Sequence, residues 1–287
     1  MEDVSVVDQN KLVLSYLHDV KHVVKLYSLE SGKPLSPETL PLPLGSIVGN
    51  MTGRREDSEL FYSFSSFITP GSIYRFDFKT LSHKVFKQVA VNGLASDLLD
   101  TKQVFYTSKD GTKVPMYIIS RKDAKLDGNN VTLLYGYGGF NISVTPYFSA
   151  TWINFIQRMK GIVVVANIRG GGEYGEEKWY KQGKLGNKQN VFDDFQCAAK
   201  YLIDRGYTRP EKLAINGGSN GGLLVGACVN QAPKLFGCAI ADVGVMDMLR
   251  FHKFTIGMSL LFTFEFIQVM LGYLITEILI TRKTLMF

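Results

Sequence analysis

A serine flanked by glycines is the residue of this chain whose setting is best suited to chemistry. Residues 217–221 read Gly-Gly-Ser-Asn-Gly and fit the pattern G-x-S-x-G, with Ser219 at the centre. A serine hydroxyl is a weak nucleophile, so it must stand exposed at a sharp turn where a base can reach it. The glycines at 217 and 221 remove side chains that would collide in such a turn. We therefore predict a nucleophilic Ser219, with the backbone N–H of Asn220 as one oxyanion donor at a helix start.

The alternative is a glycine-rich turn that contains a serine by coincidence, because so short a pattern is common by chance. The sequence on either side of the turn decides between the two interpretations. An apolar run, Leu213–Ile215, comes before it, and a helix-like apolar run begins at Gly222. This strand–turn–helix context is the one in which a nucleophilic serine of this kind occurs, and it favours the catalytic interpretation.

A second glycine motif has to be weighed against the first. Residues 170–175 read Gly-Gly-Gly-Glu-Tyr-Gly and satisfy G-x-G-x-x-G after a predicted strand, with Asp193 and Asp194 about twenty residues further on. A dinucleotide site needs a helix that opens within that loop. Gly183 and Gly186 interrupt the next segment instead, so we predict a long loop and no nucleotide.

The arginine before these glycines has a structural interpretation. Arg169 lies four residues before Glu173, and we expect the two to form a buried ion pair.

Composition excludes several classes of protein. The chain has 287 residues, 46% hydrophobic and 20% charged, which is typical of a globular protein. Its formal net charge is +6, but Arg54-Arg55, Arg121-Lys122 and Arg282-Lys283 are the only adjacent basic pairs and lie far apart in the sequence, so no nucleic-acid surface is indicated.

Cysteine and histidine usage argues against a metal and for a reduced compartment. The cysteines and histidines form no metal-ligand cluster or C-x-x-C pair, so we predict neither metal nor cofactor; they are Cys197, Cys228, Cys238, His18, His22, His83 and His252. An odd cysteine count and an acidic N-terminus without a signal-peptide core predict a cytosolic protein.

The first 92 residues have the pattern of antiparallel β-structure. Strand-like runs at Leu12–Leu17 and Val23–Leu29 recur after 48 and 49 residues, at Leu60–Phe67 and Ser72–Phe78. Propeller blades repeat at about this interval. Two such units cannot close a ring, and a small meander domain fits the same pattern.

Strands and helices alternate after Asn92. A hairpin is expected over Lys109-Asp110-Gly111. Further strands are expected at 131–135, 162–168, 213–215 and 238–241, and helices at 147–160, 191–205 and from 222 to about 230. This order predicts a parallel or mixed sheet with helices on both faces, and it places Ser219 at the carboxyl end of a strand.

Six motifs between residues 135 and 247 together carry a family resemblance: Tyr135-Gly136-Tyr137-Gly138-Gly139-Phe140-Asn141, Asn167-Ile168-Arg169-Gly170-Gly171-Gly172-Glu173-Tyr174-Gly175, Asn187-Lys188-Gln189-Asn190, Phe192-Asp193-Asp194-Phe195, Gly217-Gly218-Ser219-Asn220-Gly221-Gly222 and Val243-Gly244-Val245-Met246-Asp247. With these motifs, the chain resembles the prolyl oligopeptidase family of serine peptidases from Leu12 to Gly257. The resemblance implies the last blades of a β-propeller over residues 1–92, followed over residues 93–257 by the first part of an α/β-hydrolase domain. It also implies cleavage of short peptides after proline, in the cytosol and without a cofactor.

Four residues match functional positions of that family. Ser219 matches the nucleophile and Asn220 the backbone oxyanion donor. Tyr137 matches a tyrosine whose hydroxyl is the second donor, and Phe140 matches a wall of the proline pocket. Both aromatic residues could instead be core residues, but a tyrosine among glycines has little to pack against.

The resemblance stops after Gly257. The family's catalytic aspartate and histidine are expected beyond that point, and residues 258–287 match nothing expected there. We interpret the nearer candidates, Asp242, Asp247 and His252, as structural, so the chain as written could equally be a catalytically inactive truncated isoform or fragment.

The tail itself is strongly hydrophobic. Residues 258–280 form an apolar run of 23 residues, long enough for a membrane span, but Glu265, Gln268 and Glu277 lie within it. We therefore favour a truncated or artefactual sequence over a membrane anchor. Self-association through exposed strand edges of the partial propeller is also expected.

Overall fold

The structure is a computed structural model that describes residues 1–247, 250 and 253. It forms two compact units: residues 1–100 with 145–154, and residues 101–144 with the described residues from 155 onward. The predicted tail at 258–287 and His252 lie outside the described residues. Within the described part, no helix is long and apolar enough to cross a membrane.

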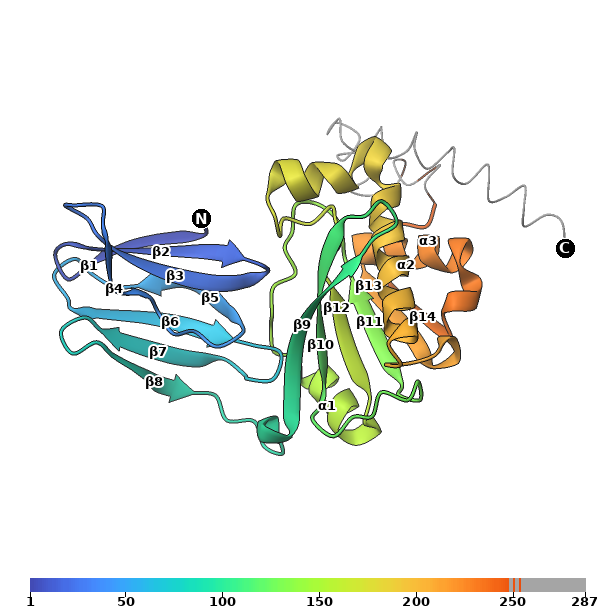
Figure 1. Ribbon diagram of the computed structural model, residues 1–287, viewed down its shortest axis with the longest axis horizontal. Coiled ribbons are helices and arrows are strands. Elements are labelled where there is room, and N and C mark those ends of the chain that lie inside the picture. The colour runs from blue at the N-terminus through green and yellow to red at the C-terminus, as the bar shows by residue number, and fades with distance from the viewer. Residues whose placement is uncertain (248–249, 251–252, 254–287) are drawn as a thin grey trace, which may run out of the picture. The chain divides into compact units, whose positions relative to one another are not determined.

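The first unit consists of two four-stranded antiparallel sheets (Figure 1). The strands of the first sheet are β1 (Asp3–Val7), β2 (Lys11–His18), β3 (Lys21–Ser28) and β4 (Pro34–Thr39), and those of the second are β5 (Ser46–Thr52), β6 (Glu59–Ser65), β7 (Ser72–Asp77) and β8 (Ser82–Gln88). In both sheets the spatial order is the chain order. Four antiparallel strands are what one propeller blade contains, so the predicted propeller blades are confirmed.

Alternating side chains of the two sheets share one apolar core. Its members are Val7, Val13, Val24, Leu26, Leu40, Ile47, Met51, Leu60, Tyr62, Phe64, Phe76 and Phe78. The sequence patterns predicted β2, β3, β6 and β7, which supply much of this core. The outer strands were missed, and two of them, β4 and β8, are mostly exposed and largely polar.

The second unit contains a six-stranded mixed sheet in the order β14-β13-β11-β12-β10-β9. Its strands are β9 (Leu99–Thr107), β10 (Lys113–Arg121), β11 (Thr132–Gly136), β12 (Ile162–Ala166), β13 (Leu213–Gly218) and β14 (Cys238–Asp242). β11 pairs in parallel with β12 and β13, and β13 with β14, whereas β10 pairs antiparallel with β12. The prediction of an incomplete α/β-hydrolase fold is confirmed.

Three helices connect the parallel strands of this sheet: α1 (Ala150–Met159), α2 (Gln189–Asp204) and α3 (Asn220–Gln231). α2 and α3 contact each other and bury one face of the sheet. That face consists of alternate strand residues such as Met116, Leu134, Val164 and Ile215. All five residues of β12 are buried, which explains why this strand has an uninterrupted apolar sequence.

We predicted a long loop after the second glycine motif, but this segment is only partly irregular. It contains three short helical turns, at Glu176–Tyr180, Lys181–Gly183 and Leu185–Asn187. Trp179 is buried within the first of them and donates its indole N–H to the carbonyl of Ile168 at 3.1 Å. Packing of this one side chain organises a segment whose glycines suggested an irregular path.

Candidate active site

Ser219 lies at a sharp turn between strand β13 and helix α3. Its backbone has φ 57° and ψ −112°, a left-handed conformation that a residue with a Cβ rarely adopts. Its N–H donates to the carbonyl of Asp242 on β14 at 2.8 Å, and its own carbonyl accepts the N–H of Gly222 at 3.0 Å. The sheet and the helix therefore fix both sides of the turn.

Two of the glycines are required by close backbone contacts. A Cβ at Gly217 would lie 2.5 Å from the carbonyl oxygen of Gly221 and 2.7 Å from that of Gly136. A Cβ at Gly221 would lie 2.6 Å from the same Gly136 oxygen. Gly218 is different, because its nearest neighbour would be at 3.8 Å. The turn therefore contacts the end of β11 closely at Gly217 and Gly221, but not at Gly218.

Tyr137 reaches the same turn from the neighbouring strand. It follows directly after β11, and the pairing of Tyr135 with Asn216 brings the ends of β11 and β13 side by side. The Ser219 side chain lies near enough to Tyr137 to lower the pKa of its phenol, an effect smaller than that of burial. Burial raises the pKa of the half-buried Tyr137, so its phenol is a neutral O–H donor at neutral pH.

Asn220 contributes both its backbone and its side chain to this site. As the first residue of α3, it has a backbone N–H without a partner inside the helix, directed at the helix N-terminus. Its side chain is 8% exposed and donates from Nδ2 to the carbonyl of Tyr137 at 2.5 Å. The two expected oxyanion donors, Tyr137 and Asn220, therefore lie on segments that are joined by this hydrogen bond.

Phe140 lies at the end of the glycine-rich segment after Tyr137. It has φ 55° and is 48% exposed. A core aromatic would be buried, so the exposure of this ring argues against the alternative that Phe140 is a core residue. Its role as a wall of a proline pocket remains a proposal.

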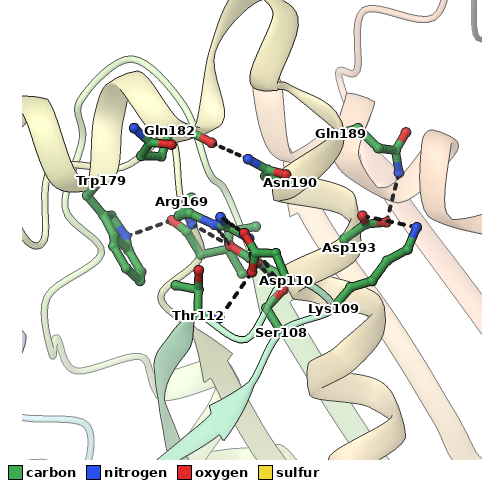
Figure 2. A network of polar contacts seen from close by, with 12 residues as sticks. Ser108, Lys109, Asp110, Thr112, Arg169, Trp179, Gln182, Gln189, Asn190 and Asp193 are labelled. Carbon is green, nitrogen blue, oxygen red and sulfur yellow. Dashed lines mark hydrogen bonds and ion pairs between the residues drawn. The ribbon is translucent and has the colours of Figure 1, made fainter.

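Arg169 does not pair with Glu173, contrary to the prediction. Figure 2 shows Arg169 beside Asp110 and Ser108, and its guanidinium also forms an ion pair with Asp194. Nε and one terminal nitrogen donate to Asp194 at 2.9 and 2.6 Å, and the other terminal nitrogen donates to Asp110 at 2.5 Å. The hydrogen bond from Arg169 lowers the pKa of Asp110 to about 2. The short separation in sequence had suggested Glu173 as the partner of Arg169. The fold instead brings the carboxylates of Asp110 and Asp194, which are more distant in sequence, to the guanidinium.

Glu173 is buried without a positive partner among its recorded contacts. One of its oxygens accepts the N–H of Val144 at 3.0 Å and the amide of Asn167 at 3.3 Å. Burial raises the pKa of Glu173 to about 7. These contacts hold the second glycine motif against the segment that follows Phe140, which is a structural task.

The remaining acidic candidates also have local partners. Asp242 accepts a hydrogen bond from Asn216 at 2.7 Å, and Asp247 pairs with Arg250 at 2.6 Å. Among the described residues, the histidines at 18, 22 and 83 all belong to the first unit, and no group of three potential metal ligands occurs. The described residues of the second unit therefore include no histidine that could act as the general base for Ser219.

One residue of the site had no predicted role. Lys188 was noted only as part of a motif, yet its Nζ donates to the carbonyl of Gly138 at 2.9 Å and to Oδ1 of Asn220 at 3.1 Å. No local sequence signal marks it, because lysines are exposed in most proteins.

A serine at a left-handed strand-to-helix turn, at the carboxyl edge of a mixed sheet, defines part of an α/β-hydrolase domain. Comparison with known proteins gives the family. Residues 146–268 match the prolyl oligopeptidase family, and residues 1–89 match the prolyl oligopeptidase N-terminal β-propeller domain. The chain belongs to the prolyl oligopeptidase family of serine peptidases.

Individual relatives agree with this assignment. The chain is 46% identical over 253 residues to prolyl oligopeptidase ophP of Omphalotus olearius, and 47% identical over 259 residues to prolyl endopeptidase of Dictyostelium discoideum. These matches cover 88% and 90% of this chain but 33% of each relative, so the chain spans about a third of their length. A solved structure of prolyl oligopeptidase B from Galerina marginata superposes with a TM-score of 0.81 at 42% identity, covering 90% of this chain and 36% of that one.

Proposed function

We propose that this chain carries the nucleophile and the oxyanion pocket of a prolyl oligopeptidase-type serine endopeptidase, which cleaves short peptides after proline. The observation that carries the proposal is the proximity of Tyr137 and Ser219 at the strand-to-helix turn, where the Ser219 side chain lowers the pKa of the Tyr137 phenol and the ends of β11 and β13 are paired. This proximity supports a neutral O–H donor near the point where negative charge develops when a serine attacks a carbonyl. A Galerina marginata relative is described in complex with a 35mer hydrolysis and macrocyclization substrate, which supports a peptide as the substrate class.

The chemistry follows from the groups at the turn. Ser219 Oγ attacks the carbonyl carbon of the proline residue, and the resulting oxyanion accepts hydrogen bonds from the Tyr137 hydroxyl and the Asn220 N–H. The C–N bond then breaks, the amine leaves with the proton that Ser219 gave up, and water hydrolyses the acyl-serine. Phe140, which lies three residues after Tyr137 and is half-exposed, forms one wall for the proline ring. No cofactor takes part in these steps.

The second candidate is a chain that is inactive by itself. It is favoured by the absence of any histidine among the described residues of the second unit, which carries Ser219. Loss of a triad member leaves only about 10³–10⁴-fold acceleration over water in comparable proteases. We therefore expect negligible turnover by the 287-residue chain, together with a Ser219 that still reacts with an activated probe. Cysteine usage and family resemblance support the cytosol as its location.

A phosphonate probe with proline at the reacting position tests the proposal. The chain is incubated with this probe and with a matched probe that carries lysine there, and labelling is located by mass spectrometry. We expect slow labelling at Ser219, faster with the proline probe, and none in Ser219→Ala. Equal labelling by both probes, or labelling elsewhere only, would contradict the proposal.

A fluorogenic proline peptide tests the second candidate in parallel. Turnover by the chain that Ser219→Ala abolishes would mean that the chain supplies its own base, and the second candidate would be wrong. Absence of turnover together with labelling of Ser219 would support it.

A further inference from the structure

Lys188 is a buried lysine beside the candidate nucleophile. It is 8% exposed and directly precedes helix α2. Its Nζ donates hydrogen bonds to two uncharged oxygens, the carbonyl of Gly138 and Oδ1 of Asn220. Burial lowers the pKa of Lys188 to about 7. A lysine kept in such a place without a carboxylate is costly, so a specific task is a better account of it than general stability.

The hydrogen bonds of Lys188 join two segments that are far apart in the sequence. Its amine links Gly138, in the segment after β11, to Asn220 at the start of α3. The Asn220 amide completes the link by donating to the Tyr137 carbonyl at 2.5 Å. An amide has one acceptor and one donor end, so the lysine fixes which way Asn220 points. Three hydrogen bonds therefore tie the backbone of Tyr137 and Gly138 to the residue after Ser219.

The segment after Tyr137 is held by backbone hydrogen bonds and by close packing of its glycines. Gly138 has φ +64° and packs against Ile168 and Val191, where a Cβ would approach within 2.5 Å. A Cβ on Gly139 would lie 2.5 Å from Nδ2 of Asn220. Two consecutive glycines contribute no side chains, so the position of this backbone is set by its carbonyl groups and by what donates to them.

We propose that Lys188 is a positioning residue that holds the Tyr137 hydroxyl and the Asn220 N–H together as one oxyanion pocket over Ser219. It does not touch the reacting atoms and acts through the Gly138 carbonyl and the Asn220 side chain. The proposal rests on the proposed function for its catalytic consequence, but the bonded arrangement itself can be measured separately.

Labelling of Ser219 by the proline phosphonate measures the catalytic consequence. Lys188→Met keeps the length of the side chain and removes its donors, so we expect labelling about 10–100-fold slower, the range that a misplacement of about 1 Å can cause. Lys188→Gln keeps N–H donors on a shorter side chain and should recover part of the rate. Lys178→Met, at an exposed lysine of the same segment, should react like the unmodified chain.

Hydrogen–deuterium exchange with mass spectrometry tests the arrangement independently of reactivity. We expect Lys188→Met to exchange faster at residues 136–141 and at the start of α3, with the rest of the second unit unchanged. Unchanged exchange there, or faster exchange throughout the chain with an unchanged labelling rate, would overturn the proposal. If Lys188→Met does not fold, the same two exchange patterns in Lys188→Gln decide in the same way. If the unmodified chain is not labelled at Ser219, the proposed function fails, and the exchange pattern still decides the role of Lys188.

Discussion

At the scale of single residues, the site consists of groups that are unfavourable when considered alone. Ser219 has a backbone conformation that costs of order 1–3 kcal/mol in residues with a side chain. Such strain persists only where the surroundings fix it, and here two backbone hydrogen bonds of Ser219 do so. The phenol of Tyr137 is half-buried against the same residue. Strain and desolvation at one point are typical of sites selected for reactivity.

Removal of the Tyr137 hydroxyl should affect reactivity and leave stability nearly unchanged. We expect Tyr137→Phe to slow phosphonate labelling of Ser219 by about 10²–10³-fold, the usual effect of losing one oxyanion donor. Tyr207→Phe removes another half-buried phenol, from the loop before β13, and should label at the normal rate. Equal rates in the two variants would show that Tyr137 is not an oxyanion donor.

Lys188 should make the stability of the chain increase with pH between about 7 and about 10.5. Its folded pKa of about 7 lies below the ordinary value of 10.5, so the folded state binds this proton more weakly than the unfolded state. The resulting loss of stability is fully present below pH 7 and disappears as pH rises to about 10.5. As the pH rises from about 7 to about 10.5, the free energy of unfolding of the unmodified chain should therefore increase relative to that of Lys188→Met. Urea unfolding of both chains measures this change. Lys178→Met should show no such slope, and a flat difference for Lys188→Met would contradict the prediction.

At the scale of elements, the strand-to-helix turn depends on how closely β11 and β13 approach it. The carbonyl of Gly136, at the end of β11, faces the positions where Gly217 and Gly221 would carry a Cβ. The parallel pairing of β11 with β13 brings this carbonyl there. The glycines of the G-x-S-x-G pattern are thus explained by a neighbouring strand as well as by the turn itself.

Alanine at two adjacent glycines should give opposite results. Gly217→Ala places a Cβ 2.5 Å from a backbone oxygen, and we expect it to lower the free energy of unfolding by about 1–3 kcal/mol or more. Gly218→Ala meets its nearest neighbour at 3.8 Å and should be tolerated. Thermal unfolding followed by circular dichroism measures both. Equal stability of the two variants would mean that the turn can move away from β11.

The buried ion pair between Arg169 and Asp194 connects the segment after β12 to α2. The exposed fraction of the side chain is 4% for Arg169 and 0% for Asp194. We expect Asp194→Asn to lower the free energy of unfolding by about 3–5 kcal/mol, because it leaves a buried guanidinium with one charged partner fewer. Asp110→Asn, whose side chain is 45% exposed, should cost no more than about 1 kcal/mol. Urea unfolding of the two variants makes the comparison, and a larger effect at Asp110 would contradict it.

At the scale of the whole molecule, the chain spans about a third of the length of the relatives it matches, and its described residues include strands at the ends of their sheets. All five residues of β14, at one end of the mixed sheet, are exposed. Five of seven residues are exposed in β8, at the end of the second antiparallel sheet. Unpaired N–H and C=O groups of such strands can pair with another chain. Association of copies is therefore the expected behaviour of the isolated chain.

Lysine substitutions on these edges test that expectation. We expect the chain to elute as oligomers or aggregates in size-exclusion chromatography with light scattering. Phe86→Lys on β8 and Ile240→Lys on β14, at positions 62% and 44% exposed, should shift it towards monomer. Met159→Lys changes an equally exposed residue on helix α1 and should not. A monomeric unmodified chain would show that the edges are protected.

The sequence by itself determined the fold class and the position of the turn. Strands such as β12 are continuous apolar runs, helix α2 has an apolar stripe, and the glycines around Ser219 mark a sharp turn, so local pattern was sufficient for each. Strands β4 and β8 escaped prediction because a polar strand at a sheet edge has no apolar period to reveal it.

Only the tertiary structure decided which side chains meet. Arg169 pairs with Asp110 and Asp194 instead of Glu173, and Lys188 lies between Gly138 and Asn220. These partners are separated by 25 to 59 residues. The order of strands in the sheet brings them together, and that order follows from burial of the whole core, which no local stretch of sequence contains.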